Sequence, residues 1–479
     1  MVFSSLTFLL IFLPLLYLLY FARTSVKWRN GVLLAMSLLF YGWGEPVWIL
    51  AMLLSTAVNF FCARAIVRRE EGAARKLILA LGVIASLSFL VYFKYAAFLC
   101  NSVAALLSLS WRTEAPRLPI GISFYTFQIL TYTVDVYRGK APAQKSPLRL
   151  LLYISCFPQL IAGPIVQYGD VADQLDERRI LPDDFSAGMQ RFIKGLAKKV
   201  LLANVCGAAL EELTLAGTGA PLSLLGAWLA AFLYTLQIYF DFSAYSDMAI
   251  GLGKTLGFTY KENFDFPYAS HSVTEFWRRW HISLGSFFRD YVYIPLGGNR
   301  RGAARTALNL LIVWALTGLW HGAAWNFVLW GLYFGVLLIL ERFALKKLIE
   351  KTPKAIRWTL TFVIAIVGWA IFYETDLHAL AGTLRALLGY ARDPALGRTA
   401  LPLLDETARK VIRQYSVFPL LAFVCSLPVV PAAKKALLAR PKGEKILSAA
   451  RAVFTALLFA LCLVFLVGQS YNPFIYFRF

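Results

Sequence analysis

Residues 306–340 decide the fold, and they read TALNLLIVWALTGLWHGAAWNFVLWGLYFGVLLIL. The stretch contains no Asp, Glu, Lys or Arg, and His321 lies near its middle. A helix needs about 20 apolar residues to cross the hydrocarbon core of a bilayer, which is about 30 Å thick. The stretch therefore predicts two membrane helices, over residues 306–320 and 324–341, with His321 in an apolar run that holds no other ionisable group.

The composition of the whole chain also indicates a membrane protein. Of its 479 residues, 59% are hydrophobic and 16% are charged, whereas roughly a quarter of the residues in soluble domains are charged. These values argue against a cytosolic globular enzyme. We expect one all-α integral membrane domain over residues 1–479, with about 11–12 transmembrane helices. The candidate apolar runs are residues 3–22, 31–43, 46–63, 77–93, 118–137, 189–210, 222–245, 306–320, 324–341, 356–373, 415–431 and 447–468.

The basic residues set the expected topology. Lys plus Arg total 48 and Asp plus Glu total 27, which gives a net charge of +21. We expect no nucleic-acid partner, because the basic residues gather in short loops between apolar runs, where they orient membrane helices and contact anionic lipid headgroups. Alternating spans place five clusters on the cytoplasmic side and both termini outside. The clusters are Arg23, Lys27 and Arg29; Arg64, Arg68, Arg69, Arg75 and Lys76; Arg138, Lys140, Lys145 and Arg149; Arg342, Lys346, Lys347 and Lys351; and Lys434, Lys435, Arg440, Lys442 and Lys445.

Three segments depart from the pattern of simple spans. Residues 157–164 read FPQLIAGP, and their prolines and glycine predict a re-entrant loop. Irregular backbone at membrane depth must be buried in protein or line a cavity, so this loop predicts a central funnel. Residues 254–305 are rich in aromatic and basic residues, which favours helices on the cytoplasmic face. Residues 374–414 are mixed in charge and are expected to form an extracytoplasmic loop.

His321 is the strongest candidate for chemistry, because an ionisable side chain at membrane depth is usually functional. The small residues Gly318, Gly322, Ala323 and Ala324 would let a ligand or a neighbouring helix approach, and Trp325, at i+4, would lie beside the imidazole. An imidazole, with a usual pKa of about 6.5, suits a general base at neutral pH. A structural histidine bonded to a helix carbonyl is the simpler alternative.

A second candidate site follows in the segment FWRRWHISLG, residues 276–285. If this segment is helical, Trp277, Arg278 and His281 share one face and Arg279 lies off it. Arginines between tryptophans at a cytoplasmic surface suit a phosphorylated cofactor. An interfacial aromatic belt with extended basic side chains explains the same pattern equally well.

The other polar residues give weaker signals. Asp241 and Asp247, near the end of an apolar run, fall on different faces of a helix, and we expect each to pair with Arg or a hydroxyl rather than to act in catalysis. The scattered histidines and six cysteines have no metal-ligand spacing, so no metal is expected. No phosphate-binding loop, GxSxG or dinucleotide motif appears, which argues against ATP-driven and nicotinamide chemistry.

The sequence resembles the membrane-bound O-acyltransferase family. It is most similar to the bacterial branch that O-acetylates extracytoplasmic polysaccharides, which includes the alginate, peptidoglycan and cellulose acetylation systems. The matching blocks run through nearly the whole chain and include FPQLIAGPIVQY, FWRRWHISLGSFFRDYVYIPLGGNR, TGLWHGAAWNFVLWG and the C-terminal YNPFIYFRF. The Trp-His-Ile-Ser and Leu-Trp-His-Gly blocks in this order are specific for the family.

This resemblance implies an enzyme with His321 as the essential family histidine and His281 as the polar residue of a second motif. It implies a helical bundle with a thinned centre in the bacterial inner membrane, and transfer of acetyl from cytoplasmic acetyl-CoA, a substrate rather than a permanently bound cofactor. Arg278 and Arg279, with Trp277, are the expected contacts for the donor. The acceptor lies outside, either on the polysaccharide or, as we expect, on a periplasmic acetyltransferase partner.

Two other functions fit parts of the pattern. A transporter or flippase of an anionic glycan would also use a funnel and positive charge, but it predicts charged residues along several spans, and such residues are few here. An acyltransferase that uses a D-alanyl or long-chain acyl donor would share the fold. The C-terminal block argues for the polysaccharide branch, but the identity of the glycan stays open.

Overall fold

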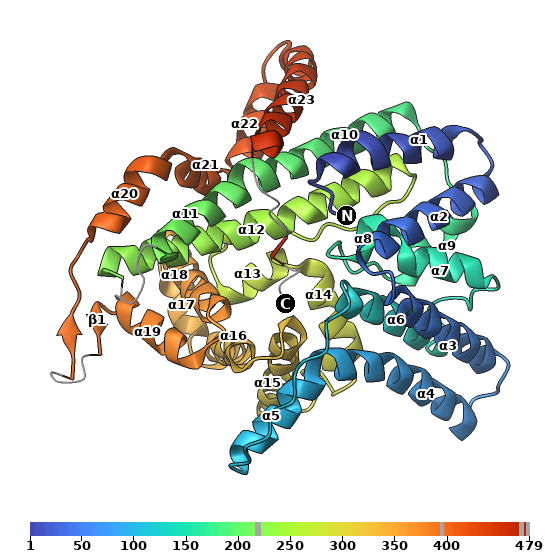
Figure 1. The fold of residues 1–479 in the computed structure, drawn as a ribbon, viewed down its shortest axis with the longest axis horizontal. Coiled ribbons are helices and arrows are strands. Elements are labelled where there is room, and N and C mark those ends of the chain that lie inside the picture. The colour runs from blue at the N-terminus through green and yellow to red at the C-terminus, as the bar shows by residue number, and fades with distance from the viewer. Residues whose placement is uncertain (216–221, 393–396, 469–473, 476–479) are drawn as a thin grey trace. The chain divides into compact units, whose positions relative to one another are not determined.

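The computed structural model describes residues 1–215, 222–392, 397–468 and 474–475, which are almost entirely helical (Figure 1). In this part of the chain, strand structure is confined to Tyr390–Ala391 (β1) and Thr399–Ala400 (β2), which pair antiparallel. The prediction of an all-α protein is confirmed. Chain contacts define two compact units: unit 1 comprises Met1–Ile193 and Tyr245–Glu262, and unit 2 comprises Lys194–Ala244 and Asn263–Phe479.

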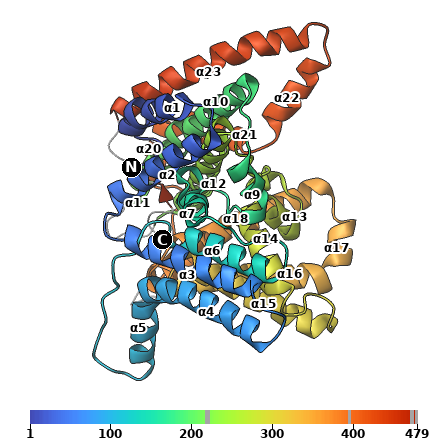
Figure 2. The same ribbon diagram turned by 90° about the vertical axis from the view of Figure 1, so that its right-hand side faces the viewer.

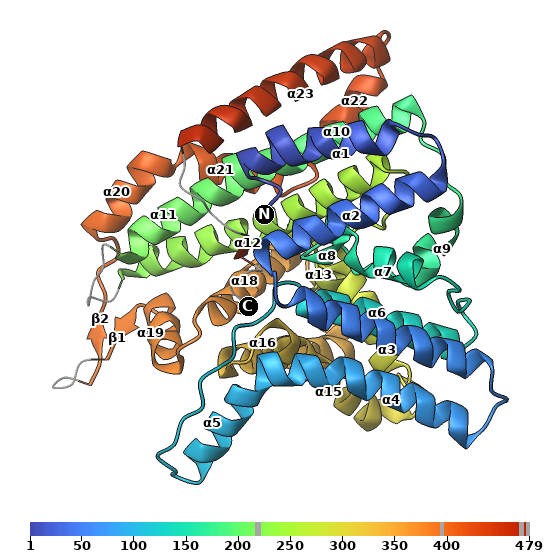
Figure 3. The ribbon, with the colours of Figure 1, turned by 45° about the vertical axis from the view of Figure 1, so that its right-hand side comes forward.

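Unit 1 holds the N-terminal helices. Figure 3 shows α3, α4 and α6 side by side, and α4 continues through a π-helical turn into α5. The elements are η1 (Phe8–Phe12), α1 (Leu13–Phe21), α2 (Val26–Gly44), α3 (Ile49–Val67), α4 (Ala73–Leu90), η2 (Val91–Tyr95), α5 (Ala96–Leu106), α6 (Ile122–Tyr137), α7 (Pro147–Ser155), α8 (Phe157–Leu160), α9 (Tyr168–Asp176) and most of α10 (Pro182–Ala197).

Unit 2 holds the candidate catalytic residues. The long helix α12 (Leu224–Thr255) belongs to it as far as Ala244. Figure 2 shows α22 and α23 as a helical pair that extends away from α15 and α16 of the same unit. The other elements are η3 (Lys198–Ala203), α11 (Asn204–Leu215), η4 (Pro267–Ala269), α13 (Val273–Arg279), α14 (Ile282–Phe288), η5 (Arg289–Tyr293), α15 (Gly302–His321), α16 (Trp325–Phe343), α17 (Lys346–Lys351), α18 (Lys354–Tyr373), α19 (Leu377–Leu387), α20 (Glu406–Tyr415), α21 (Val417–Cys425), α22 (Val429–Leu438) and α23 (Gly443–Gly468).

Within the described ranges, fewer helices than the expected 11–12 have the length and apolar composition of a bilayer span. Among the described residues, seven helices are long and apolar enough to cross a bilayer, and the bent pair α21 and α22, at 63°, makes an eighth. Several expected spans form shorter or interrupted helices: α6 has 16 residues, and the run 189–210 is broken by the π-helical turn η3. A polytopic membrane fold is nevertheless confirmed, because apolar helices of this length recur through the chain.

The segment 157–164 is a buried short helix followed by a tight turn. Helix α8 packs its Phe157 ring against Phe12 and Phe40, at 5.4 Å between ring centroids in both cases. The Phe157 N–H donates to Ser37 Oγ at 3.2 Å. A side chain at Gly163 would lie 2.7 Å from Gln159 Cα, so the turn requires glycine. Irregular backbone here is enclosed by protein, as membrane depth requires; the predicted funnel stays a prediction.

The two other irregular segments form short helices. Residues 254–305 contain η4, α13, α14 and η5, separated by turns, and residues 374–414 contain α19, the β1–β2 hairpin and most of α20. Their expected positions on the cytoplasmic and extracytoplasmic faces stay predictions of the charge pattern. All the residues singled out in 276–321 lie in unit 2, so their mutual geometry can be read directly.

Candidate active site

His321 is the last residue of α15, and its side chain is buried at 5% exposure. The aromatic rings around the imidazole include Trp320, Trp330 and Phe372, with ring centroids 4.9, 5.1 and 5.1 Å away. The C-terminus of a helix carries a partial negative charge, which stabilises a cation there. The imidazole therefore lies at the negative end of the α15 dipole.

The sequence left open whether the small residues around His321 admit a ligand or a neighbouring helix. The structure shows that they admit a neighbouring helix, α16. A side chain at Gly318 would lie 2.1 Å from the Phe327 carbonyl oxygen, and one at Gly331 would lie 2.2 Å from the Trp314 carbonyl oxygen. Glycine on both helices thus allows α15 and α16 to pack backbone against backbone. This hairpin fixes the position of His321 at its tip.

The expected i+4 relation between His321 and Trp325 does not hold. Helix α15 ends at His321, Gly322 is extended with φ −167°, and Trp325 begins α16 with half of its side-chain surface exposed. Helical spacing therefore gave the wrong neighbour. The ring of Trp330, one turn further along α16, packs on the imidazole instead.

His281 is buried and held in a defined tautomer. Its Nδ1 lies 3.2 Å from Asn263 Oδ1, and the same Oδ1 accepts the backbone N–H of Ser283 at 3.1 Å. Since a backbone N–H only donates, the Asn263 atom that faces it is the amide oxygen, and His281 must carry its proton on Nδ1. Nε2 is then the basic nitrogen. Burial lowers the pKa of His281 to about 3, so it is neutral at physiological pH.

The two histidines belong to one aromatic cluster. The Trp320 ring contacts the His281 ring at 5.9 Å and the His321 ring at 4.9 Å. The cluster continues through Trp330 to Trp277, at 5.5 Å between ring centroids. The structure thus brings together three of the five predicted site residues in a water-poor interior.

The two arginines lie in different surroundings. Arg278 is exposed and, among the described residues, forms no ion pair. Arg279 is half-buried, donates to Glu275 Oε1 at 2.9 and 3.1 Å, and also donates to the Asp265 carbonyl oxygen at 3.2 Å. Arg279 therefore already holds α13 against the preceding loop.

The predicted common face of Trp277, Arg278 and His281 is wrong, because the helix does not extend that far. Helix α13 ends at Arg279, Trp280 is extended, and His281 adopts a left-handed conformation with φ +45° and ψ +54°. The helix is interrupted between Arg279 and Ile282, so the two halves of the motif lie on separate helices. Trp277 points into the aromatic cluster while Arg278 points to the exterior.

Both acidic residues of α12 are paired, as predicted. Asp241 is buried and accepts from Lys199 Nζ at 2.5 Å and from the backbone N–H of Ile475 at 2.6 Å. The cation is thus a lysine rather than the expected arginine. In unit 1, Asp247 accepts from Arg191 at 2.8 Å. Neither carboxylate needs a catalytic role to explain its presence.

Two asparagines that position the site were missed by sequence reasoning. Asn263 fixes the His281 tautomer, and Asn326 donates to the Phe372 carbonyl oxygen at 3.0 Å, which ties the end of α18 to the start of α16. A signal for Asn326 was present, since it is a polar residue inside an apolar run, five positions after His321. Nothing local marks Asn263, which is 18 residues before its histidine.

The remaining candidates give no further site. Over the part of the chain that the structure describes, no group of three or more His, Cys, Asp or Glu side chains is placed to hold a metal ion. Cys156, Cys206 and Cys462 are buried free thiols. The site can therefore be described as two buried imidazoles in an aromatic interior, which suits proton transfer to or from a bound hydroxyl.

Comparison with known proteins identifies the family. Residues 79–374 match the model of the membrane-bound O-acyltransferase family, and this range contains every candidate site residue. The chain is 38% identical to a protein named probable alginate O-acetylase from Pseudomonas putida, with both chains covered completely. It is 32% identical to a peptidoglycan O-acetyltransferase from Helicobacter pylori, over 81% of this chain and 80% of the relative.

A more distant relative shares the family's core. A teichoic acid D-alanyltransferase from Bacillus subtilis is 28% identical over 54% of this chain and 69% of its own length. The family match covers more than half of the chain, and the full-length relatives extend the similarity to both ends. The chain therefore belongs to the membrane-bound O-acyltransferase family and is a polytopic membrane O-acyltransferase.

Proposed function

We propose that this protein transfers acetyl from cytoplasmic acetyl-CoA to an acceptor on the other side of the bacterial inner membrane, for O-acetylation of a polysaccharide. The observation that carries the proposal is His321, which lies at the end of α15, enclosed by aromatic rings and within the family match. The names of two relatives, alginate O-acetylase and peptidoglycan O-acetyltransferase, support an acetyl donor and a glycan product.

His321 acts as the general base in this proposal. The acceptor hydroxyl attacks the thioester carbonyl carbon while the imidazole takes the hydroxyl proton. The C–S bond then breaks, and the departing thiolate takes the proton back from the imidazolium, so the histidine is regenerated. His281, neutral and with its proton on Nδ1, offers Nε2 as a hydrogen-bond acceptor in the same aromatic cluster.

Arg278 is the stronger of the two candidates for the phosphates of the donor. Its guanidinium is exposed and unpaired among the described residues, whereas Arg279 already bonds Glu275. Arginine suits phosphate because its planar fork gives paired, charge-assisted hydrogen bonds. Trp277 extends from the same helix into the aromatic cluster, so helix α13 would link the phosphate site to the reacting thioester.

The acceptor outside the membrane is, in this proposal, a periplasmic acetyltransferase that passes acetyl to the polysaccharide. A separate partner is favoured because the described segments outside the membrane helices are short helices and a small hairpin, which form no soluble domain to process a polymer. Acetyl-CoA is a consumed substrate, and the reaction as written needs no resident cofactor.

The choice of donor is tested with purified protein in detergent. Radiolabelled acetyl-CoA, a D-alanyl thioester and palmitoyl-CoA are each offered with a membrane-free periplasmic extract that contains the acceptor. We expect label to reach the acceptor from acetyl-CoA alone, and only with an intact His321. Preferred use of the D-alanyl or palmitoyl donor would contradict the proposal.

A further inference from the structure

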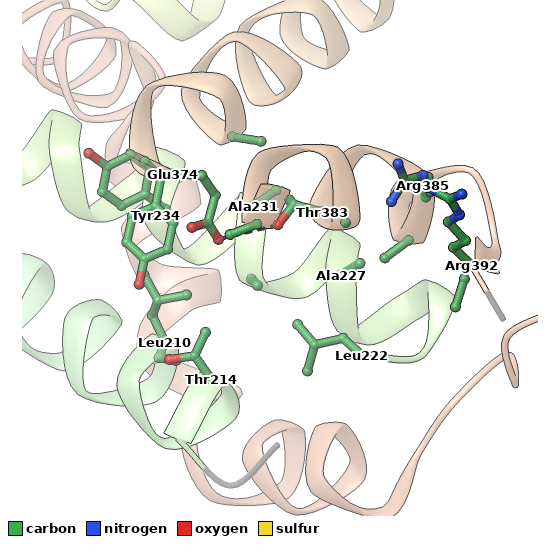
Figure 4. A pocket seen from close by; sticks show the side chains of 17 residues that line it. Leu210, Thr214, Leu222, Ala227, Ala231, Tyr234, Glu374, Thr383, Arg385 and Arg392 are labelled. Atoms are coloured by element: carbon green, nitrogen blue, oxygen red, sulfur yellow. Dashed lines mark hydrogen bonds between the residues drawn. The ribbon is translucent and has the colours of Figure 1, made fainter. Parts of the chain in front are cut away.

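Unit 2 contains a cavity of about 590 Å³ outside the aromatic cluster. Residues of α11, α12, α18, α19 and β1 line it, and Figure 4 shows their side chains. Its volume falls within the roughly 300–1,000 Å³ typical of small-molecule sites. The polar groups that matter are those of Tyr234, Tyr373, Glu374, Thr383, Arg385 and Arg392; most of the remaining wall is alanine and leucine.

One end of the cavity carries groups that bond hydroxyls. Glu374 accepts from Thr383 Oγ1 at 3.2 Å, and burial raises the pKa of the Glu374 carboxyl. No cation pairs with Glu374 among the described residues, so its oxygens keep capacity for further donors. The Tyr234 and Tyr373 rings lie 4.7 Å apart beside it and present apolar faces with polar tips.

The other end of the cavity is cationic. Arg385, on α19, and Arg392, just after β1, both line the cavity, and Figure 4 shows them at the end away from Glu374 and Tyr234. Within the described ranges neither guanidinium forms an ion pair, and a guanidinium can offer an anion bidentate, charge-assisted hydrogen bonds. Two like charges at one site repel each other, and an anionic ligand would offset that repulsion.

The cavity is linked to His321 through the last turn of α18. Phe372 packs its ring on the imidazole, and the next two residues, Tyr373 and Glu374, form part of the cavity wall. The Asn326 side chain holds this helix end by donating to the Phe372 carbonyl oxygen. A ligand in the cavity therefore binds the same helix end that contacts the candidate base.

We propose that this cavity binds a carboxylated saccharide, with Arg385 and Arg392 on the sugar carboxylates and Glu374 and Thr383 on its hydroxyls. The inference rests on the proposed function, because the loop that builds the cavity is expected on the extracytoplasmic side, where the polysaccharide that finally receives acetyl from the partner lies. A saccharide is favoured over an acidic peptide because the cavity combines a cationic end, a hydroxyl-bonding end and two tyrosine ring faces. The chain would thereby hold the polymer while acetyl passes outward.

The test measures binding of a hexuronic acid hexamer, and of a neutral hexose hexamer of equal length, to the purified full chain in detergent. We expect the charged oligomer to bind at least about 10-fold more tightly at low salt, because charge-assisted hydrogen bonds are involved. The double variant Arg385→Ala/Arg392→Ala should lose that preference. Arg413→Ala, an exposed arginine of α20 that does not line the cavity, should bind like the wild type.

Control variants separate the possible outcomes. The double variant Arg385→Lys/Arg392→Lys keeps the charge, so it should retain part of the preference and exclude simple unfolding. His321→Ala should bind the oligomer normally. If the wild type binds the oligomer but does not transfer acetyl, the proposed function is refuted and the assignment of the cavity stands. Equal affinity for the neutral hexamer, an unchanged double Ala variant, or tighter binding of an aspartate-rich peptide would overturn the assignment of the cavity.

Discussion

His321 combines three properties that a general base needs: it is enclosed by rings, it ends a helix, and its hairpin is held by backbone contact. Replacement by alanine should lower acetyl transfer by roughly 100- to 10,000-fold, which is the usual contribution of a general base. The protein should still fold, since a smaller side chain leaves the glycine contacts of α15 and α16 intact. The measurement is acetate bound to the glycan in cells with matched membrane levels of each variant.

The control for this prediction is His378→Ala. His378 is exposed on α19 and lines neither the aromatic cluster nor the cavity, so its loss should leave acetylation unchanged. Acetylation near the wild-type level in His321→Ala would remove His321 from catalysis and return it to a structural role.

His281 makes the stability of the fold depend on pH. Its pKa is about 3 in the folded protein and about 6.5 when the chain unfolds. Between these values the unfolded state binds more protons, so the stabilisation that His281 contributes is complete above about pH 6.5 and is lost as pH falls toward 3. The thermal midpoint in detergent should therefore fall more steeply from pH 7 to pH 4.5 in the wild type than in His281→Gln. Identical slopes would show that His281 does not titrate in this way.

The close packing of α15 on α16 predicts a strong effect of adding one methyl group. Gly318→Ala would bring Cβ to 2.1 Å from the Phe327 carbonyl oxygen, so the helices must move apart and His321 moves with them. We expect a lower thermal midpoint and loss of most activity. Gly285→Ala is the matched control, because nothing lies within 4 Å of its added Cβ. A Gly318→Ala protein as active as the control would show that the hairpin is not held in this way.

The buried pair of Lys199, in η3, and Asp241, in α12, joins these elements to the backbone of Ile475. Removing one partner leaves an uncompensated buried charge, which costs about 3–5 kcal/mol, whereas exposed pairs contribute about 0–1 kcal/mol. Asp241→Leu should therefore lower the thermal midpoint strongly, and adding Lys199→Met should recover much of the loss. The exposed pair Lys261–Asp170 serves as control. Additive effects of the two buried substitutions would contradict the pairing.

Much of this element-level detail could not be predicted from the sequence. The apolar run with its single histidine, and the tryptophan-rich second motif, sufficed for the fold class and the candidate residues. The partner of Asp241 could not be named, because Lys199 is 42 residues away and only the tertiary fold brings the two together. The break at His281 was missed because a positive φ in a non-glycine residue has no local sequence signal. Among the described residues, fewer helices than expected have the length of a span, because apolar content alone does not reveal where a helix ends.

At the scale of the whole molecule, the topology predicted from the basic clusters agrees with a reaction that crosses the membrane. The basic clusters predict that residues 342–351 lie in the cytoplasm, and α18 runs from those residues to Glu374 and the cavity. A donor that cannot cross the bilayer and an acceptor outside it are separated by about 30 Å of hydrocarbon unless the protein shortens the path. His321 would lie where the two routes meet.

Transfer across a closed membrane tests this account most directly. Inside-out vesicles that hold the purified partner acetyltransferase in their lumen receive radiolabelled acetyl-CoA from the outside, which is the cytoplasmic face. We expect label on the luminal partner with the wild type and none with His321→Ala, while the vesicles remain sealed to free acetyl-CoA. If label reaches the partner only when donor and partner are placed on the same side, transfer is single-sided and the proposed acetyl relay is contradicted.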